Sequence, residues 1–176
     1  MNRHASNCVV LVALLSLAAC DGTPKPTQPL ATPAIGAPSM TLASGVTQTQ
    51  LGRANLGKVN AHSKVDGFEA ELKTQDDADV TMSSTVMAPG GSTGWHGHPG
   101  MVIVLIKSGA LTFYEANDPT CTPIVHPAGT VVLETSGDVH IARNEGSINT
   151  EFVVTQILAA GVAPRIDAPA PGNCPF

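Results

Sequence analysis

Charged and aromatic side chains are scarce in this 176-residue chain, at 13% and 3% of the residues. Acidic residues outnumber basic ones by 14 to 9, which gives a formal net charge of −5 at pH 7. A chain with so few cations does not build the basic surface that nucleic acids or anionic lipid headgroups attract. The composition therefore disfavours both as partners of the folded domain.

Motifs of several enzyme classes are also missing from the sequence. It has no G-x-S-x-G segment, no glycine-rich phosphate loop before a helix, and no Cys-x-x-Cys pair. A sustained helical period of apolar residues is absent, whereas Val, Thr, Gly and Ala are plentiful. This usage favours short strands and turns over helices.

A series of short apolar segments, separated by Gly, Pro or acidic turns, has the character of strands. They are residues 68–73, 80–87, 101–106, 111–114, 131–133, 141–143 and 152–158. The continuously apolar segment 101–106 is typical of a strand covered on both faces. Short strands with this punctuation predict an all-β barrel or double-sheet jelly roll around a single core.

A pair of histidines, His96 and His98, follows the glycine-rich segment 89–94 and carries the clearest chemical signal. Alternate residues of a strand point to the same side, so both rings can approach one ion. A third histidine, His140, lies after a second glycine turn. Three neutral imidazoles suit Fe, Zn, Cu or Ni and fit Mg or Ca poorly. We expect one divalent transition metal on these histidines; a pocket or structural domain without metal is the alternative.

Both histidine segments resemble the motifs of the cupin family. The first motif, G-x5-H-x-H-x3,4-E-x6-G, and the second, G-x5-P-x-G-x2-H-x3-N, are matched by Gly90, His96, His98 and Gly109, and by Gly129, Gly137, His140 and Asn144. The resemblance implies a single-domain, cupin-type double-stranded β-helix, a jelly-roll barrel, over residues 50–160. Cupins include dioxygenases, isomerases, decarboxylases, storage proteins and sugar sensors, so the fold alone selects no reaction.

The chain departs from the cupin pattern at two positions. Thr135 replaces the proline of the second motif, a mild change because Gly137 can still make the turn. Val102 replaces the glutamate of the first motif, which removes one of the ligands that the family implies and leaves a side chain that can pack against the pocket wall. Glu134 or Glu151 could supply a carboxylate from a new position, but the simpler interpretation of each is a solvated surface acid.

A site of three histidines without a carboxylate resembles the thiol dioxygenases and diketone-cleaving enzymes of the cupin superfamily, in which Fe(II) keeps positions free for substrate and O2. The resemblance implies a metal-dependent dioxygenase acting on a small molecule. An ion that keeps its full double charge favours anionic or chelating substrates. The alternative function is a non-catalytic cupin module that binds a small ligand or a metal ion at the membrane surface. Either a monomer or a homodimer is compatible with the sequence.

Other residues near the motifs are assigned to the surroundings of the metal. We expect Asn144 to orient backbone or a group behind a ligand rather than to bind metal itself. Trp95, the only tryptophan, either lines the pocket mouth or caps the barrel core. His126 matches no motif position and is interpreted as a surface or loop histidine.

The N-terminus has the features of an export signal. An apolar run over residues 8–19 is too short to span a bilayer and ends in small residues before Cys20. Residues 17–20 resemble the lipobox of bacterial lipoproteins, which implies a signal peptide over 1–19 and a lipid on Cys20; an ordinary signal peptide is the alternative. Residues 20–49 are rich in Pro and Thr and are expected to form an extended tether. The protein would then be exported and lipid-anchored, facing the periplasm or the cell exterior.

Removal of the signal and lipidation of Cys20 would leave two cysteines in the domain, Cys121 and Cys174. In an oxidising compartment an even pair favours a disulfide, with two buried free thiols as the alternative. The bond would tie a C-terminal tail, residues 161–176, to the segment between the two motifs.

Overall fold

The computed structural model describes residues 40–176, and this part of the chain contains twelve strands and no helix. The strands are β1 (Ser44–Gly57), β2 (Asn60–Val65), β3 (Phe68–Lys73), β4 (Ala78–Ser92), β5 (His96–Gly97), β6 (Met101–Ser108), β7 (Ala110–Glu115), β8 (Ile124–Pro127), β9 (Val131–Glu134), β10 (His140–Arg143), β11 (Thr150–Ala159) and β12 (Ile166–Asp167). Within residues 40–176, no helix is available to cross a membrane. The all-β prediction is confirmed.

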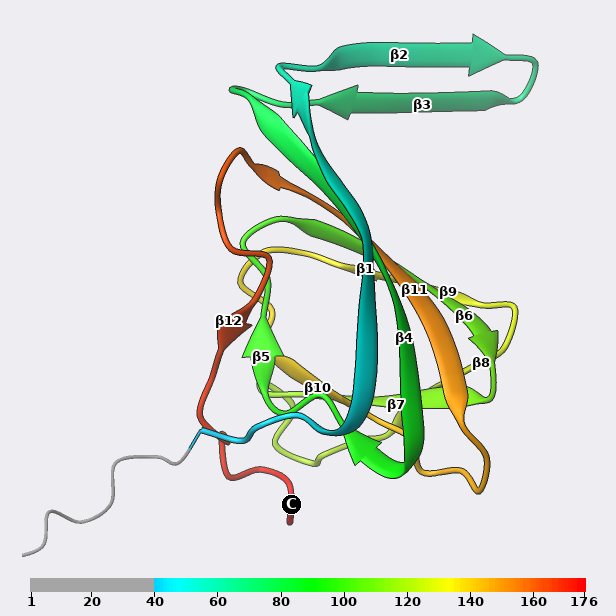
Figure 1. The fold of residues 1–176 in the computed structure, drawn as a ribbon, viewed down its shortest axis with the longest axis vertical. Helices are drawn as coiled ribbons and strands as arrows, with labels where there is room; N and C mark the ends of the chain where they lie inside the picture. Colours follow the sequence, from blue (N-terminus) through cyan, green and yellow to red (C-terminus); the bar gives the residue numbers. More distant parts are fainter. Residues whose placement is uncertain (1–39) are drawn as a thin grey trace, which may run out of the picture. The chain divides into compact units, whose positions relative to one another are not determined.

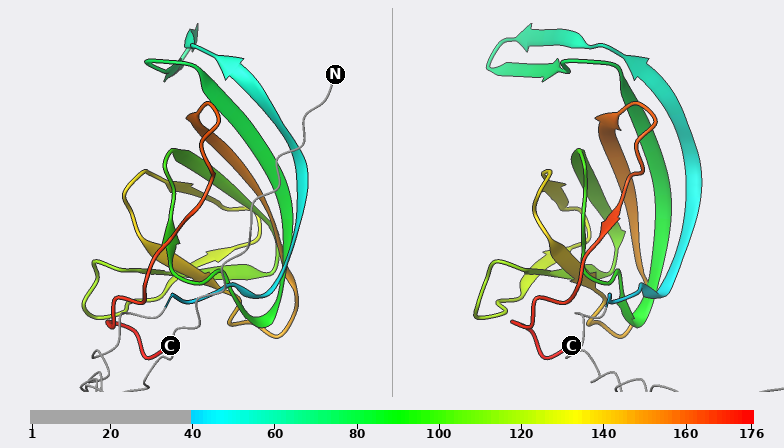
Figure 2. Two further views of the ribbon diagram at one scale, coloured as in Figure 1. Left: turned by 60° about the vertical axis from the view of Figure 1, so that its left-hand side comes forward. Right: turned by 90° about the vertical axis from the view of Figure 1, so that its left-hand side faces the viewer.

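Ten strands form one antiparallel sheet that curls into a barrel (Figures 1 and 2). The long strand β4 lies between β1 and β11, and the sheet continues from β11 through β6 to β9. On the other side, β10 pairs with β4, β5 and β7, and β12 is added to β5. The two motif segments, β5 and β10, are therefore direct neighbours.

The inward face of the barrel carries the core, because successive residues of a strand alternate between the two faces of a sheet. In β6, Val102, Val104 and Ile106 are buried, whereas Met101 and Ile103 are 44% and 38% exposed. The expectation that this segment is covered on both faces is therefore wrong. On its outer face, Ile103 and Leu105 pair with the exposed Leu133 and Val131 of β9, so these side chains form a joint apolar surface.

The first strand begins earlier than the sequence analysis predicted. Residues 44–49, assigned to the tether, belong to β1 and pair with β4 over Ser44↔Ser92 to Thr49↔Ser84, so the barrel does not start at residue 50. Composition obscured this strand, because its Thr and Gln side chains lie on an exposed edge while Val46 packs against the core. The predicted signal peptide, Cys20 and the rest of the tether lie outside the described residues.

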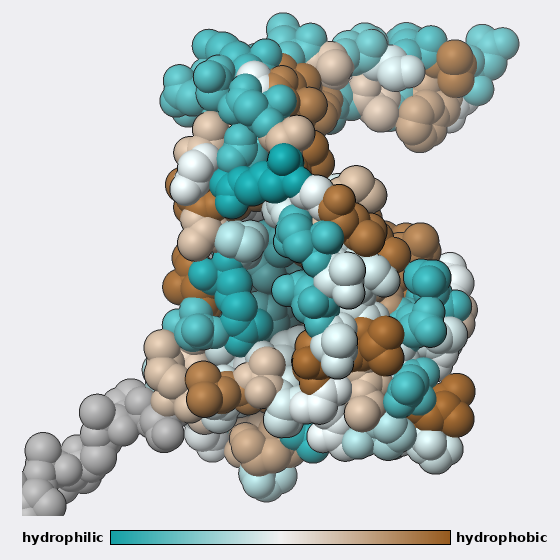
Figure 3. Space-filling model, in the orientation of Figure 1, coloured by the Kyte–Doolittle hydropathy of each residue, from teal (hydrophilic) through white to brown (hydrophobic). Residues whose placement is uncertain are grey.

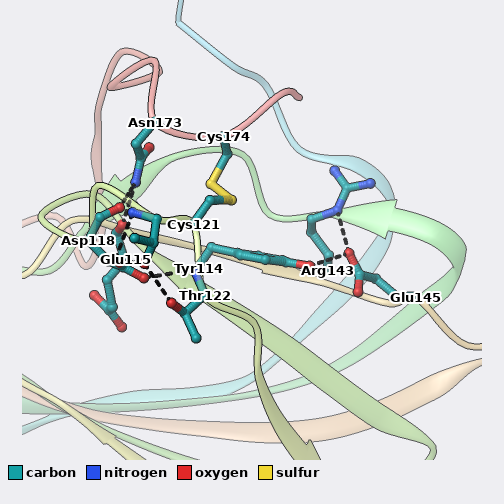
Figure 4. Close-up of a disulfide and its surroundings, with 10 residues drawn as sticks. Tyr114, Glu115, Asp118, Cys121, Thr122, Arg143, Glu145, Asn173 and Cys174 are labelled. Atoms are coloured by element: carbon teal, nitrogen blue, oxygen red, sulfur yellow. Dashed lines mark hydrogen bonds and ion pairs between the residues drawn. A yellow bond between two sulfur atoms is a disulfide. The ribbon is translucent and has the colours of Figure 1, made fainter.

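The predicted disulfide between Cys121 and Cys174 is present (Figure 4). Next to it, the Asn173 side-chain amide donates to the carbonyl oxygens of Glu115 and Asp118, at 2.9 and 2.6 Å. The C-terminal tail is held by more than the disulfide. Its strand β12 also pairs with β5, which places the tail beside the first motif.

Strands β2 and β3 form a separate two-stranded sheet inserted between the paired strands β1 and β4. All but one of its strand residues are exposed, including Val65 and Phe68 at the hairpin turn. The hairpin contributes no residue to the cavity lined by His96, His98 and His140.

Candidate metal centre

The structure brings the three predicted histidines together at one end of the barrel interior. His96 lies on β5, His98 follows that strand, and His140 opens β10 in register with His96. One nitrogen from each ring lies within 4.8 Å of the others. All three rings are buried, at 6%, 6% and 2% exposure. This proximity is what a single bound ion requires.

Backbone carbonyls orient two of the rings. The Nδ1 atom of His96 lies 2.9 Å from the carbonyl oxygen of Gly94, and Nδ1 of His98 lies 2.9 Å from that of Pro164. A carbonyl oxygen only accepts hydrogen bonds, so each Nδ1 carries the proton and donates. The Nε2 lone pair of each ring is then free to bind a metal, an arrangement common behind metal-binding histidines.

Glu134 supplies a carboxylate that the first motif lacks. Its Oε2 lies 3.1 Å from Nε2 of His98, its Oε1 lies 3.5 Å from Nε2 of His140, and its side chain is 8% exposed. Glu134 is directly opposite Val102 in the pairing of β9 with β6, and such pairs share one face of a sheet. The interpretation of Glu134 as a solvated surface acid is therefore wrong. Glu151, in contrast, is on the surface and pairs with Lys107 at 3.0 Å.

Burial keeps His96 and His140 neutral. It lowers the pKa of His96 to about 2, with smaller contributions from electrostatic interactions with His140 and Arg165. Burial is also the main reason for the lowered pKa of His140, although Glu134 acts in the opposite direction. Neutral imidazole is the form that binds metal, so these rings are ready to bind without first losing a proton.

A cavity of about 220 Å³ adjoins the histidines. Figure 3 shows hydrophilic residues bordering a recess on one face of the domain. The apolar wall of the cavity includes Val46, Val104, Leu111, Phe113, Phe152 and Val154, and its polar groups besides the four candidate ligands include Gln48, Thr85, Thr93, Gln156 and Arg165. The lining is therefore mainly apolar, with polar groups at a few places, as in ligand sites.

The remaining predicted residues lie around the site rather than in it. Trp95 is fully buried with Tyr114 and Ile141, against the C-terminal tail, so it caps the core. The Asn144 amide donates to the carbonyls of Met87 and Ile148 and thereby holds backbone in place. Val102 is fully buried in the main apolar cluster. His126, on β8, stacks edge-on against Phe113 with ring centroids 5.4 Å apart.

Several residues that line the cavity were not predicted from the sequence. Thr85 and Gln156 lie inside segments predicted as strands, and the alternation along those strands was the available signal. Arg165 and Pro164 had no such signal, because the position of the tail depends on β12 and on the disulfide.

Residues 83–156 match the family model for the cupin domain. Together with the all-strand barrel, this match identifies a cupin domain within the chain. No curated protein matches the chain significantly.

The solved structures that resemble this chain are distant in sequence. A cupin-like protein from Thermotoga maritima is 21% identical, with a TM-score of 0.45 over 52% of this chain and 65% of that one. An oxalate oxidase is 24% identical, with a TM-score of 0.39 over 48% and 50% of the two chains. A Cupin 2 conserved barrel domain protein from Salinispora arenicola is 20% identical, with a TM-score of 0.45 over 69% and 82%. This chain thus spans less than two thirds of the length of the first two.

Proposed function

We propose that this cupin binds one divalent transition metal through His96, His98, His140 and Glu134, and that it acts as a metal-dependent dioxygenase on a small molecule. The observation that carries the proposal is the buried carboxylate of Glu134, at 3.1 and 3.5 Å from the Nε2 atoms of two histidines. Three imidazoles and one carboxylate suit Fe, Zn, Cu or Ni. A metal would also give the buried carboxylate the partner that a charge needs away from water.

The four groups fit such an ion by their chemistry. Two rings hold their protons on Nδ1, and burial keeps His96 and His140 neutral. The site differs from the carboxylate-free three-histidine site expected from the first motif, because Glu134 would cancel one charge of the ion. One positive charge would remain at the ion, close to the guanidinium of Arg165, so an anionic ligand is still favoured.

The cavity lining favours a reaction in which the ion, rather than a side chain, does the chemistry. Apart from the candidate ligands, the polar lining groups are hydroxyls, amides and one guanidinium, none of which exchanges protons readily near neutral pH. A redox-active ion such as iron would supply the chemistry of O2. The chain itself would bind and orient the substrate and exclude water with its apolar wall.

The same lining supports a second candidate, a module that binds a small ligand or a metal without turnover. Among the described cavity residues, no general acid or base stands apart from the four groups that face the ion. A site that only binds needs none. Turnover separates the two candidates.

Elemental analysis of the full-length protein, purified without a metal-binding tag, tests the proposal. We expect close to one transition metal per chain, and none in a His96→Ala/His98→Ala variant. O2 consumption with a set of small acids then separates the candidates: uptake supports the dioxygenase, and binding without uptake supports the module. No metal in the wild-type protein, even after reconstitution, would refute both metal-based functions.

We also propose that the protein is exported and carries a lipid on Cys20. The Cys121–Cys174 disulfide supports export, because such bonds persist in oxidising compartments. Mass spectrometry of the mature N-terminus tests the lipid: a diacylglyceryl group on Cys20 is expected, and an unmodified N-terminus elsewhere would contradict it.

A further inference from the structure

We propose that the ligand of the cavity is a small monocarboxylic acid with an apolar body and, remote from the carboxylate, a hydroxyl or carbonyl group that hydrogen-bonds to Thr85. The proposal rests on the proposed function, because the carboxylate would bind beside the metal-binding residues. The size, the wall and two polar residues of the cavity each restrict the ligand.

The size of the cavity favours a small ligand. Its volume of about 220 Å³ is below the roughly 300–1,000 Å³ of typical ligand pockets. The Phe113, Phe152 and Leu111 side chains form much of its wall. A compact body without charge, aromatic or branched, buries these surfaces and gains the free energy of removing them from water.

Arg165 places a positive charge at the end of the cavity that holds the histidines. It directly precedes β12, which pairs with the strand of His96. Its Nε donates to Asp167 at 2.6 Å and one Nη2 hydrogen to the Thr93 carbonyl at 2.8 Å, which fixes the guanidinium. Among the described residues, its Nη1 group has no hydrogen-bond partner and can donate to an anion. A ligand carboxylate satisfies this group because Arg binds carboxylates well.

Thr85 marks a second polar position in an otherwise apolar wall. Its side chain lines the cavity, it is 1% exposed, and its Oγ1 has no hydrogen-bond partner. Its cross-strand neighbours are Gln48 on β1 and Phe152 on β11. A buried hydroxyl without a partner is costly and rare in folded proteins. A ligand that brings a hydroxyl or carbonyl oxygen to this point gives Thr85 the missing bond.

The register separates Thr85 from Glu134, which lies with Arg165 at the histidine end of the cavity. Glu134 pairs with Val102, and Val102 with Gln156; Thr85 pairs with Phe152, four residues before Gln156 on the same strand. Four residues of a strand extend about 13 Å between Cα atoms, and side chains reach into the cavity from both rows, so the two oxygens of the ligand need a shorter separation. The carboxylate and the second oxygen therefore belong at opposite ends of the ligand.

Calorimetric titration of the zinc-loaded full-length protein tests the proposal, since zinc has no redox chemistry and binding is not confused with turnover. The probes are two matched pairs, 4-hydroxybenzoate with benzoate and 5-hydroxypentanoate with pentanoate. At least one hydroxylated acid should bind about five- to thirtyfold more tightly than its partner. Replacing the carboxylate, as in 4-hydroxybenzyl alcohol, should weaken binding further.

Two variants locate the effect. Thr85→Val should abolish the preference for the hydroxylated acid without lowering the melting temperature, because it removes an unpartnered hydroxyl; a purely structural Thr85 would instead lose stability. Arg165→Gln should weaken both acids of a pair alike, whereas Lys107→Gln on the surface should weaken neither. The absence of any preference in both pairs, or a preference that survives Thr85→Val, would overturn the proposal.

Metal content shows whether the proposed function or the proposed ligand class has failed. If zinc does not bind but the metal-free protein still prefers the hydroxylated acid through Thr85, the proposed function fails and the ligand class stands. If zinc binds and no preference exists, the ligand class fails and the metal site stands.

Discussion

Strands β6 and β9 lie side by side and face the same cavity, yet they contribute to it in different ways. The inward residues of β6 are Val102, Val104 and Ile106, all apolar and buried, whereas β9 ends in the buried carboxylate of Glu134. In the cupin pattern the carboxylate belongs at the position of Val102. Directly paired residues on one face are only about 5 Å apart, so a side chain on either strand reaches much the same space. Either of two paired strands can therefore bring a carboxylate to the histidines.

The largest effect on metal affinity is expected from removing a histidine of the candidate metal site. His98→Ala removes a ring whose Nε2 faces Glu134 and should lower metal affinity at least about a hundredfold. The matched control is His62→Ala, since His62 lies half-exposed on the β2–β3 hairpin. Metal content by elemental analysis is the measurement. A fully loaded His98→Ala protein would remove this histidine from the site.

Glu134→Gln removes only the carboxylate that β9 contributes to the site. It keeps the shape of the side chain but removes its charge, so we expect metal affinity to fall about ten- to a hundredfold. Glu151→Gln is the control, because Glu151 pairs with Lys107 on the surface. Competition with a chelator of known affinity measures both. Equal affinity of the two variants would mean that Glu134 is not a ligand.

Moving the carboxylate from β9 to β6 tests whether either strand can supply it to the site. Glu134→Val should lose metal affinity as Glu134→Gln does, and adding Val102→Glu in the same chain should restore it to within about tenfold of the wild type. Val102→Glu alone places two carboxylates opposite each other and should lower the melting temperature of the metal-free protein. No recovery in the double variant would show that β9 offers a geometry that β6 cannot.

In the metal-free protein, His96 should make the free energy of unfolding depend on pH. Burial lowers the pKa of His96 to about 2 from 6.5. The unfolded chain therefore binds a proton that the folded chain does not, and stability is complete above pH 6.5 and falls as the pH drops. The slope is about 1.4 kcal/mol per pH unit for one such histidine. His98, His140 and Arg165 act electrostatically on this ring, and Glu134 lies beside His98 and His140.

Urea denaturation of the chelator-treated protein at pH 7.5 and 5.5 measures this slope. His96→Gln should reduce it, because glutamine does not titrate. An unchanged slope in that variant would assign the pH dependence to other groups.

The smallest effect on the metal is expected from opening the disulfide. Cys121→Ala/Cys174→Ala removes a bond between residues 53 apart and should cost about 2–4 kcal/mol of stability. Because β12 still pairs with β5, the Pro164 carbonyl should stay near His98, and metal affinity should fall only a few fold. Thermal unfolding and metal titration give the two values. A complete loss of metal in folded protein would show that the bond itself holds the site.

The sequence predicted those parts of the site that depend on spacing. The two motifs fixed which histidines meet, and every segment predicted as a strand lies within a strand of the structure. The direction of Glu134 was not predictable, because the turn over 135–139 separates it from His140 and interrupts the alternation that would relate them.

The contributions of the chain ends were also missed, for a different physical reason. The residues of β1 are mostly exposed and polar, so no apolar pattern distinguished them from a tether. The tail is rich in Pro and Ala, and its position depends on contacts with segments distant in the sequence, namely the pairing with β5 and the bond to Cys121. Such contacts leave no local pattern in the sequence from which they could be predicted.

The separation of 66 residues between His98 and Pro164 sets the order in which the site can form during synthesis. His98 receives its backbone partner only after Pro164 has emerged, and the tail is fastened only after Cys174 has been oxidised. In an exported protein, oxidation follows translocation. If the protein is exported as proposed, the finished centre would arise outside the cytoplasm, and the ion that it first meets would be drawn from the metals of the destination compartment rather than from those of the compartment of synthesis.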